Sequence, residues 1–429
     1  MVGAWLLAGV VAAPAWAGET VRVSLGNSGN EANGESEGHP FGGVNTQGTI
    51  VAFTSSADDL VAGDTNGQDD LFVRDLKQGA TTRVSVATDG SQANGFSGLG
   101  TISGNGRYVA FVSEATNLVA GDTNVSRDVF FHDRTTGETA RVSVNSAGIQ
   151  GDADSGGSGF LSISGNGHAV AFNSSATNLV ADDTNAADDV FVHVIKTGET
   201  TRVSLASDGS EGNDTSLQPS SNANGKVIAF ASIATNLVAG DTNGKVDIFV
   251  RDVTKGTTVR ASIASDGSES NGNSGQPAIS ANGKVVAFVS NASSLVAADT
   301  NAVVDAFVHD LKTGATTCVS VASDGTLANG GSGAVAISAN GRFVIFESDA
   351  SNLVPADTNG AKDVFVHDRK TGQTVRVNLD GAGVQSTGNI GFDLGLSKNG
   401  RFAFFSSDAP ALVVGDNNTV ADVFRHDLK

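Results

Sequence analysis

The sequence contains very little of several residue types on which many proteins depend. Its 429 residues include one cysteine, one methionine, one tyrosine, two tryptophans and six prolines. A single cysteine cannot form an internal disulfide or a cysteine-rich zinc site. Both tryptophans (Trp5 and Trp16) precede residue 18. The rest of the chain therefore lacks the aromatic residue that often anchors binding surfaces, which weakens sugar-stacking and aromatic hot-spot interpretations.

Basic residues are also scarce, because 26 lysines and arginines face 46 aspartates and glutamates and the formal net charge is −20. Such a chain repels phosphate backbones and anionic membrane surfaces, so we expect no nucleic-acid partner. After residue 17 no apolar run approaches the length of a membrane span. The hydrophobic content of 39% is sufficient for a folded core.

Residues 1–17 (MVGAWLLAGVVAAPAWA) form an uncharged, mostly apolar segment that ends in Ala15-Trp16-Ala17. A short apolar run followed by a small-x-small tripeptide is typical of a secretory signal peptide, although the usual basic residues before it are missing. The alternative is a buried first strand. We expect residues 1–17 to be a signal peptide and the protein to be secreted or periplasmic.

One sequence unit is repeated seven times after this segment. The tripeptide Asp-Thr-Asn recurs 58 to 61 residues apart, and Asp416-Asn417-Asn418 is an altered seventh copy. Each unit also has two phenylalanines 19 residues apart: Phe53/Phe72, Phe111/Phe130, Phe172/Phe191, Phe230/Phe249, Phe288/Phe307, Phe346/Phe365 and Phe405/Phe424. We interpret the pairs as packing between neighbouring sheets, where aromatic side chains contribute most burial.

Each unit predicts four short strands and no helix. Around Asp299 the alternating pattern predicts strands at 284–290, 305–310, 316–321 and 334–338. Seven four-stranded units predict an all-β, seven-bladed propeller that forms a single domain over residues 18–429. The last unit stops after its third strand, and residues 20–25 match the fourth-strand pattern. We therefore expect the N-terminal strand to complete the last blade and close the ring.

Two stretches of the unit resemble a known repeat. Residues 279–290 (ISANGKVVAFVS) and 305–310 (DAFVHD) resemble the TolB-type repeat, also called PD40 or WD40-like, which reads approximately SPDGKxIAFxS followed by DIYVMD. The resemblance implies an exported propeller that acts as an interaction module. The chain differs from TolB in having seven units, no separate N-terminal domain, and Ala/Gly-Asn-Gly turns in place of Pro-Asp-Gly.

The repeated loops share the pattern Asp-x-Asn-x-x-x-Asp, which collects side-chain oxygens as short calcium-binding loops do. The seven triplets, our candidate calcium ligands, are Asp64/Asn66/Asp70, Asp122/Asn124/Asp128, Asp183/Asn185/Asp189, Asp241/Asn243/Asp247, Asp299/Asn301/Asp305, Asp357/Asn359/Asp363 and Asp416/Asn418/Asp422. The alternative is purely structural, because aspartate and asparagine also fix turns by bonding their own backbone. The sequence leaves both roles open.

Two further positions vary between copies. The fourth predicted strand carries an arginine in six units (Arg22, Arg83, Arg141, Arg202, Arg260 and Arg376) and Cys318 in the remaining one. We expect these arginines to guard an edge strand against sheet addition and Cys318 to be an incidental free thiol. A histidine or arginine precedes the last aspartate in most third strands, where we expect a cation near an acidic neighbour.

The sequence predicts a non-catalytic binding or interaction scaffold that is a monomer and whose partner is a protein or a cell surface. The alternative is a propeller enzyme, such as a polysaccharide lyase or hydrolase or a peptidase-associated protein, with a pocket on the loop face. Non-repeating residues would form that pocket. The most irregular segments, 145–159, 211–218 and 380–393, contain no convergent acid/base set.

Overall fold

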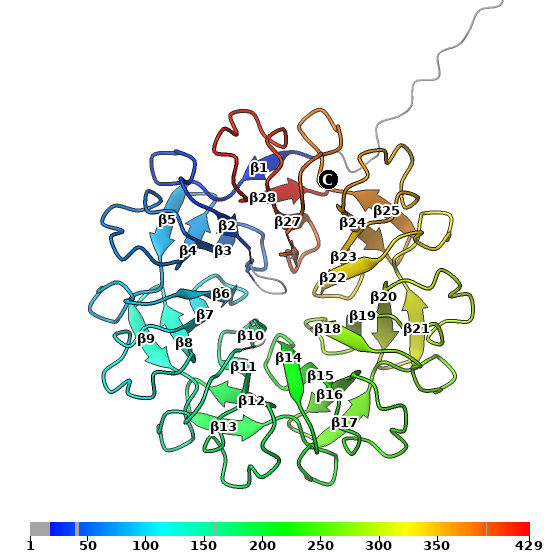
Figure 1. Cartoon of the computed structure of the whole chain (residues 1–429), viewed down its shortest axis with the longest axis horizontal. Helices are drawn as coiled ribbons and strands as arrows, with labels where there is room; N and C mark the ends of the chain where they lie inside the picture. Colours follow the sequence, from blue (N-terminus) through cyan, green and yellow to red (C-terminus); the bar gives the residue numbers. More distant parts are fainter. Residues whose placement is uncertain (1–17, 39–42, 158, 392) are drawn as a thin grey trace, which may run out of the picture.

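Seven four-stranded antiparallel sheets stand around a central axis as the blades of a propeller (Figure 1). The computed structural model describes residues 18–38, 43–157, 159–391 and 393–429, and these residues form 28 strands and no helix. Accordingly, no helix in the described ranges is long and apolar enough to cross a membrane. The expected all-β, seven-bladed propeller is confirmed. Residues 1–17, the expected signal peptide, lie outside the described residues.

Six blades use four consecutive strands each, and the seventh combines the two ends of the chain. The first three blades are β2 (Ser36–Glu37), β3 (Ile50–Ser55), β4 (Asp70–Asp75), β5 (Ala80–Arg83); β6 (Ser97–Ile102), β7 (Tyr108–Ser113), β8 (Asp128–Asp133), β9 (Glu138–Arg141); and β10 (Leu161–Ile163), β11 (Ala169–Ser174), β12 (Asp189–Val194), β13 (Glu199–Arg202). The next three are β14 (Ser216–Ser221), β15 (Val227–Ser232), β16 (Asp247–Asp252), β17 (Thr257–Arg260); β18 (Ser274–Ile279), β19 (Val285–Ser290), β20 (Asp305–Asp310), β21 (Ala315–Cys318); and β22 (Ser332–Ile337), β23 (Phe343–Ser348), β24 (Asp363–Asp368), β25 (Gln373–Arg376). The seventh contains β26 (Gly395–Leu396), β27 (Phe402–Ser407), β28 (Asp422–Asp427) and β1 (Thr20–Arg22).

The fourth, outermost strand of each blade is shorter than the sequence predicts. In the fifth blade the predicted strand 316–321 is β21, which ends at Cys318. Beyond it, the Ser320 hydroxyl accepts a hydrogen bond from the Ala306 amide at 3.1 Å and donates to the Asp305 carboxylate at 2.6 Å. A side chain thus replaces the backbone ladder at this point, which alternation in the sequence cannot reveal.

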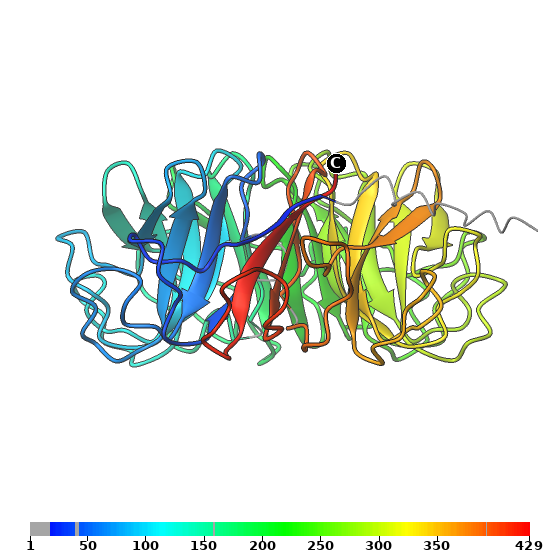
Figure 2. The same cartoon turned by 90° about the horizontal axis from the view of Figure 1, so that it is seen from above.

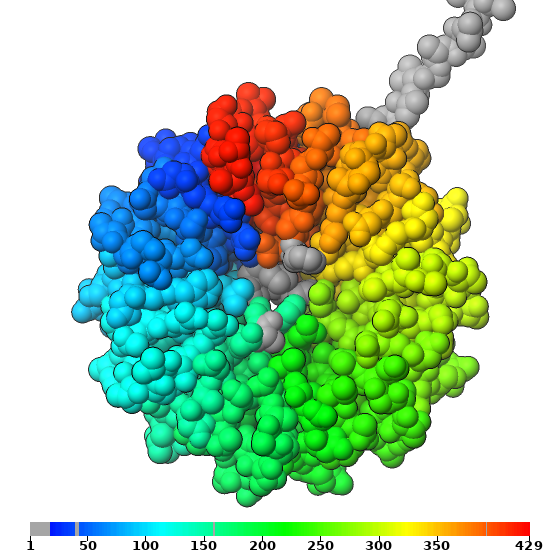
Figure 3. All heavy atoms as spheres, viewed as in Figure 1, coloured from blue at the N-terminus to red at the C-terminus, as the bar shows by residue number. Residues whose placement is uncertain are grey.

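The N-terminal strand closes the ring, as expected. β1 pairs antiparallel with β28, and Thr20 lies opposite His426 in the register. The pairing continues past β1, because the Val23 amide donates to the Val423 carbonyl at 2.7 Å. In the space-filling view the N-terminal and C-terminal segments lie side by side in one sector (Figure 3). Each end of the chain therefore satisfies the strand edge of the other.

The hydrophobic core is divided into seven layers, one between each pair of neighbouring blades. In one layer Phe111 and Phe130 of the second blade pack against Ala52, Leu71 and Val73 of the first. The two phenylalanines lie opposite each other in the strand register, and such pairs recur in all seven blades with ring centroids 5.7–6.0 Å apart. The predicted role of the phenylalanine pairs is confirmed.

The disc has two different faces, which are separated in the side view (Figure 2). The hairpin face carries the turns between first and second strands and between third and fourth strands, together with the C-terminus. The loop face carries the longer loops between second and third strands and the loops between blades. The two loop families touch there, since the Asn66 side-chain amide donates to the Ala93 carbonyl at 3.0 Å. Both loop families therefore share one face.

Candidate functional site

In six of the seven blades the outermost strand places an arginine between the two aspartates of the loop triplet. In the third blade Arg202 Nη1 lies 3.7 Å from Asp183 Oδ1 and 2.8 Å from Asp189 Oδ2. In the other five, guanidinium nitrogens lie within 3.4 Å of both carboxylates: Arg22, Arg83, Arg141, Arg260 and Arg376. These side chains are only 5–11% exposed. The expectation that they guard an exposed edge is wrong, because they are buried counter-ions.

The asparagine of each triplet fixes the loop. Asn66 Oδ1 accepts a hydrogen bond from the Gln68 amide at 3.1 Å, which is an Asx turn. Its Nδ2 donates to Asp70 Oδ2 at 2.8 Å and to the Ala93 carbonyl. The bond to a carbonyl of the following inter-blade loop recurs in all seven blades, through Asn66, Asn124, Asn185, Asn243, Asn301, Asn359 and Asn418. The structural role that was the alternative to calcium binding, fixing the turn, is therefore present in all seven blades.

A third acidic residue joins the cluster in three blades, and the sequence analysis did not identify it. In the third blade carboxylate oxygens of Asp183, Asp189 and Glu211 all lie within 4.8 Å of one another, around Arg202. The position nine residues after the arginine carries Glu31, Gln92, Gln150, Glu211, Glu269, Leu327 or Gln385. This constant offset of nine was the sequence signal that could have revealed the third member.

The same cluster separates the pKa values of its carboxyl groups. Burial raises the pKa of Asp183 to about 6, although Arg202 opposes the shift. Burial also acts to raise the pKa of Glu211, but hydrogen bonds from Thr184 and the contact with Arg202 outweigh it and lower that pKa to about 2. One guanidinium thus neutralises only part of the negative charge that three carboxylates collect here.

The fifth blade lacks the guanidinium because Cys318 occupies the arginine position and Leu327 the glutamate position. Asp305 keeps its bonds from Asn301 Nδ2 and Ser320 Oγ. In the described part of the chain, buried Asp299 Oδ1 has no hydrogen-bond partner and Asp299 has no ion pair. Burial raises the pKa of the Cys318 thiol to about 12, so the sulfur stays protonated. Two carboxylates face each other here without the cation found in the other blades.

The third-strand histidines are buried hydrogen-bond partners, which corrects the expectation of a cationic residue at that position. His132 Nδ1 lies 2.8 Å from Thr139 Oγ1, whose hydroxyl donates to the Val86 carbonyl of the preceding blade's outgoing loop at 2.6 Å. Burial lowers the pKa of His132 to about 4, which leaves the ring neutral at pH 7. In the first blade Arg74 takes this place and donates to the Leu25 carbonyl at 3.1 Å. The histidine or arginine at this third-strand position thus helps to link neighbouring blades by hydrogen bonds.

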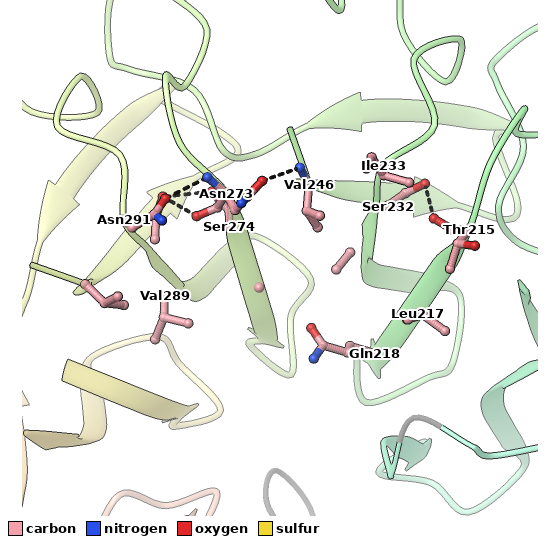
Figure 4. Close-up of a pocket in the computed structure, with 14 residues that line it drawn as sticks. Thr215, Leu217, Gln218, Ser232, Ile233, Val246, Asn273, Ser274, Val289 and Asn291 are labelled. Atoms are coloured by element: carbon pink, nitrogen blue, oxygen red, sulfur yellow. Dashed lines mark hydrogen bonds between the residues drawn. The ribbon is translucent and has the colours of Figure 1, made fainter. Parts of the chain in front are cut away.

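An apolar groove opens on the loop face between the fourth and fifth blades (Figure 4). Its volume is about 490 Å³, and its walls include Leu217, Ile233, Val246, Val289 and Val304. Ile233 and Val304 are each 38% exposed, so the groove presents apolar surface to solvent. Asparagine and hydroxyl groups form one rim, where Asn273 Oδ1 accepts from the Val246 amide at 3.0 Å. The groove contains no charged or catalytic acid/base side chain among its lining residues.

Strained backbone marks the inner edge of this groove. β14 and β18 each contain a register shift against the neighbouring strand, and Gln218 and Gln276 sit there with φ of 56° and 52°. Non-glycine residues rarely occupy this left-handed region. The same bulge occurs in β6, where Leu99 has a φ of 56°, so it belongs to the repeat and not to the groove alone. The Gln218 side chain accepts a hydrogen bond from the Gln276 amide at 2.8 Å and links the two blades.

Carboxylates gather across the ring from the groove. Glu37 belongs to β2 of the first blade and Asp393 precedes β26 of the seventh, whereas the groove lies between the β14 and β18 blades on the other side of the ring (Figure 1). Glu347 belongs to β23 of the sixth blade, next to the β18 blade. Burial raises the pKa of Asp393 to about 7, and the charges of Glu37 and Glu347 raise it further. Glu347 is paired with Lys362 at 3.0 Å. The loop face around the axis of the ring, here called the loop-face mouth, therefore carries an apolar groove at the fourth and fifth blades and the carboxylates of Glu37 and Asp393 at the first and seventh.

No family model matches the sequence, and no curated protein matches it. Solved structures do match. A structure of oligogalacturonate lyase in complex with manganese is 11% identical with a TM-score of 0.56, over 96% of this chain and 98% of the lyase chain. The propeller domain of the Trilobed protease from Pyrococcus furiosus is 9% identical with a TM-score of 0.53, over 92% and 96% of the two chains. TolB from Acinetobacter baumannii is 13% identical with a TM-score of 0.42, over 80% of this chain and 63% of TolB.

At such low identity these likenesses show the fold alone. The seven four-stranded sheets and the likeness to the Pyrococcus propeller domain confirm the propeller fold that the sequence resemblance implied. The Pyrococcus domain is described as having an open velcro topology, whereas β1 and β28 close the ring in this protein.

Proposed function

We propose that this protein is a non-catalytic binding scaffold whose loop-face mouth receives an extended segment of a partner protein. The segment presents an apolar side chain to the groove between the fourth and fifth blades and a basic side chain to Glu37 and Asp393. The observation that carries the proposal is the presence of an apolar groove and of the acidic residues Glu37 and Asp393 on the same face of the ring, in different blades.

The chemistry of the groove supports a protein partner. A cavity of about 490 Å³ that is walled by Leu217, Ile233 and Val289 can bury an apolar side chain, at about 25 cal/mol per Å² of surface removed from water. The rim supplies amide and hydroxyl groups for backbone recognition. A net charge of −20 favours a basic segment and speeds its encounter.

A displayed library of random short peptides, selected on the immobilised protein and counter-selected on a Leu217→Asn variant, tests this proposal. We expect enriched peptides to combine an apolar residue with lysine or arginine and to lose at least tenfold in affinity for the variant. Leu311→Asn, a partly buried position away from the groove, serves as the control. Enrichment of acidic or purely polar peptides, or equal binding to the Leu217 variant, would contradict the proposal.

The alternative function is enzymatic, and the fold match with the oligogalacturonate lyase structure is the observation in its favour. Incubation of the protein with oligogalacturonides and manganese, followed by ultraviolet detection of unsaturated products, distinguishes the two functions. The scaffold proposal predicts no product above the level given by a heat-denatured sample. Turnover that scales with protein concentration would establish the enzymatic alternative.

We further propose that calcium binds one of the seven triplets, Asp299/Asn301/Asp305. In the other six an arginine already lies between the two carboxylates, so a metal there has to displace a buried guanidinium. Among the residues that the structure describes, the buried Asp299 Oδ1 of the fifth blade lacks a hydrogen-bond partner, and Asp305 Oδ2 accepts a hydrogen bond from Asn301. Two carboxylates, nearby carbonyls and water supply the oxygen ligands that calcium prefers.

Replacing Cys318 by arginine is expected to fill this position with the chain's own cation. In the wild type we expect calcium to raise the midpoint of thermal unfolding relative to excess chelator, because a ligand that binds only the folded state stabilises it. In Cys318→Arg we expect a higher midpoint without calcium and no further shift with it. Cys318→Ser should keep the calcium effect. A wild-type midpoint that does not respond to calcium, or an equal shift in Cys318→Arg, would overturn the assignment.

We also propose that residues 1–17 direct export, based on their apolar run and the Ala15-Trp16-Ala17 tripeptide. Expression of the full chain in a bacterium, followed by fractionation and N-terminal sequencing, tests this. The expected product begins at Gly18 and lies outside the cytoplasm, whereas an uncleaved cytoplasmic product would contradict export.

A further inference from the structure

The hairpin face narrows the central channel with a ring of backbone hydrogen bonds. One residue from each first turn takes part: Thr46, Gly104, Gly165, Ala223, Ala281, Ala339 and Lys398. The amide of Gly104 donates to the Gly165 carbonyl at 2.8 Å, and the amide of Ala339 donates to the Lys398 carbonyl at 2.9 Å. Each blade is bonded to the next in this way, so the ring holds its seven positions close to the channel.

Lys398 is the exception in this ring. The other six positions carry glycine, alanine or threonine, which keeps the channel open. Lys398 lines a cavity of about 390 Å³ on one side and a small cavity of about 20 Å³ on the other. It is the only charged residue among those that line either cavity. A long cationic side chain at one of seven equivalent positions is not required by the repeat.

The surroundings of Lys398 leave its ammonium group without a counter-charge. Within the described ranges it has no ion pair, although the chain carries 46 acidic residues. Surrounding protein lowers its pKa by desolvation, and no neighbouring charge contributes. Lys398 is partly buried, and a cation that is partly withdrawn from water without a counter-charge is stabilised by a bound anion.

We propose that Lys398 and the larger cavity bind a small monocarboxylate with a compact apolar body. The ammonium group faces the carboxylate, and the hydroxyl-bearing residues Thr46, Ser162 and Ser221 line the same cavity. Val44, Ile102 and Ile163 supply apolar contact for the rest of the ligand. A single lysine in a protein of net charge −20 favours one negative charge over the two of a phosphate. A volume of about 390 Å³ lies within the usual range for small-molecule sites.

Isothermal titration of the full chain with benzoate, butyrate and inorganic phosphate tests this inference. We expect one of the two carboxylates to bind the wild type and to bind Lys398→Met at least tenfold more weakly. Lys284→Met, which removes an exposed lysine from the equivalent turn two blades away on the same face, should bind like the wild type. The Lys398→Met variant should unfold at the same or a higher temperature without ligand, which shows that weaker binding does not come from misfolding.

Three results would overturn the inference: no binding of either carboxylate to the wild type, equal binding to Lys398→Met, or tighter binding of phosphate than of both carboxylates. The site lies on the face opposite the groove, so none of these results bears on the proposed scaffold function. Lys398→Gln provides a second uncharged variant, and the same tenfold loss is expected for it.

Discussion

Replacing Arg202 by methionine is expected to lower the free energy of unfolding by about 3–5 kcal/mol at pH 7, the usual cost of removing one partner from a buried ion pair. The substitution leaves the carboxylates of Asp183, Asp189 and Glu211, whose oxygens lie within 4.8 Å of one another, without a counter-ion. Asp189 is fully buried, so water cannot replace the lost guanidinium. Urea unfolding followed by circular dichroism measures the effect.

The loss should also depend on pH. The pKa of Asp183 is already raised to about 6, so its protonation favours the folded state, and this contribution disappears as the pH rises through that value. Without Arg202 the pKa of this carboxyl rises further, and the pH range over which stability is lost extends upward. We therefore expect a larger difference between variant and wild type at pH 8 than at pH 5. A difference that grows toward pH 5 would contradict this account.

The chain offers a matched control, because its fifth blade naturally lacks both the arginine and the glutamate. The double variant Arg202→Cys/Glu211→Leu reproduces the pair Cys318 and Leu327 in the third blade. We expect it to be more stable than Arg202→Cys alone, since removing Glu211 relieves part of the repulsion. A double-mutant cycle gives the coupling between the two positions. Purely additive losses would mean that the two side chains do not interact.

Removing residues 18–25 is expected to cost on the order of 5 kcal/mol or more. The truncation deletes β1, exposes the edge of β28 and removes Val23, which is fully buried and contributes about 1.5–3 kcal/mol by burial. It also removes Arg22, the counter-ion of the buried carboxylates of Asp416 and Asp422. The last blade then has three strands and an unpaired edge that invites association with other chains.

Thermal unfolding and analytical ultracentrifugation measure both consequences of this truncation. We expect a lower unfolding midpoint and concentration-dependent association for the chain that starts at residue 26. A chain that starts at Gly18 should unfold like the full-length protein and remain monomeric. If the chain that starts at residue 26 shares the midpoint and sedimentation of the Gly18 chain, β1 does not close the ring.

The fold could be predicted from the sequence because every blade repeats the same pattern of strands, turns and phenylalanine pairs. The fixed 19-residue offset between phenylalanines such as Phe111 and Phe130 reflects a cross-strand pair on adjacent strands, and seven copies of it specify seven blades. Closure was also predictable, since residues 20–25 carry the fourth-strand pattern that the last unit lacks. Strand ends were less accurate, because side chains such as Ser320 replace backbone bonds at the end of β21.

The candidate site was less predictable because it depends on contacts that the repeat does not encode. The arginine lies 13 residues after the last aspartate of its triplet, as for Arg202 and Asp189, but alternation alone assigned it to an exposed edge. The groove combines residues of two blades that differ from their counterparts, such as Leu217 and Val304. Only the irregular segment 211–218 indicated part of it. Lys398 occupies a turn position that carries glycine, alanine or threonine in the other six blades. The residues that line its cavity come from several blades, so only the three-dimensional structure identifies them.

Fluorescence anisotropy of one labelled peptide that carries an apolar residue followed by lysine tests the central proposal most directly. It is titrated with the wild type, with Leu217→Asn for the apolar groove, and with Glu37→Gln/Asp393→Asn for the acidic residues. We predict saturable binding to the wild type, at least tenfold weaker binding to each variant, and tighter wild-type binding at pH 8 than at pH 6, because Asp393 has a pKa of about 7 and loses its proton in that range. Unchanged affinity in both variants, or no binding to the wild type by any peptide of this composition, would contradict a binding function for the loop-face mouth.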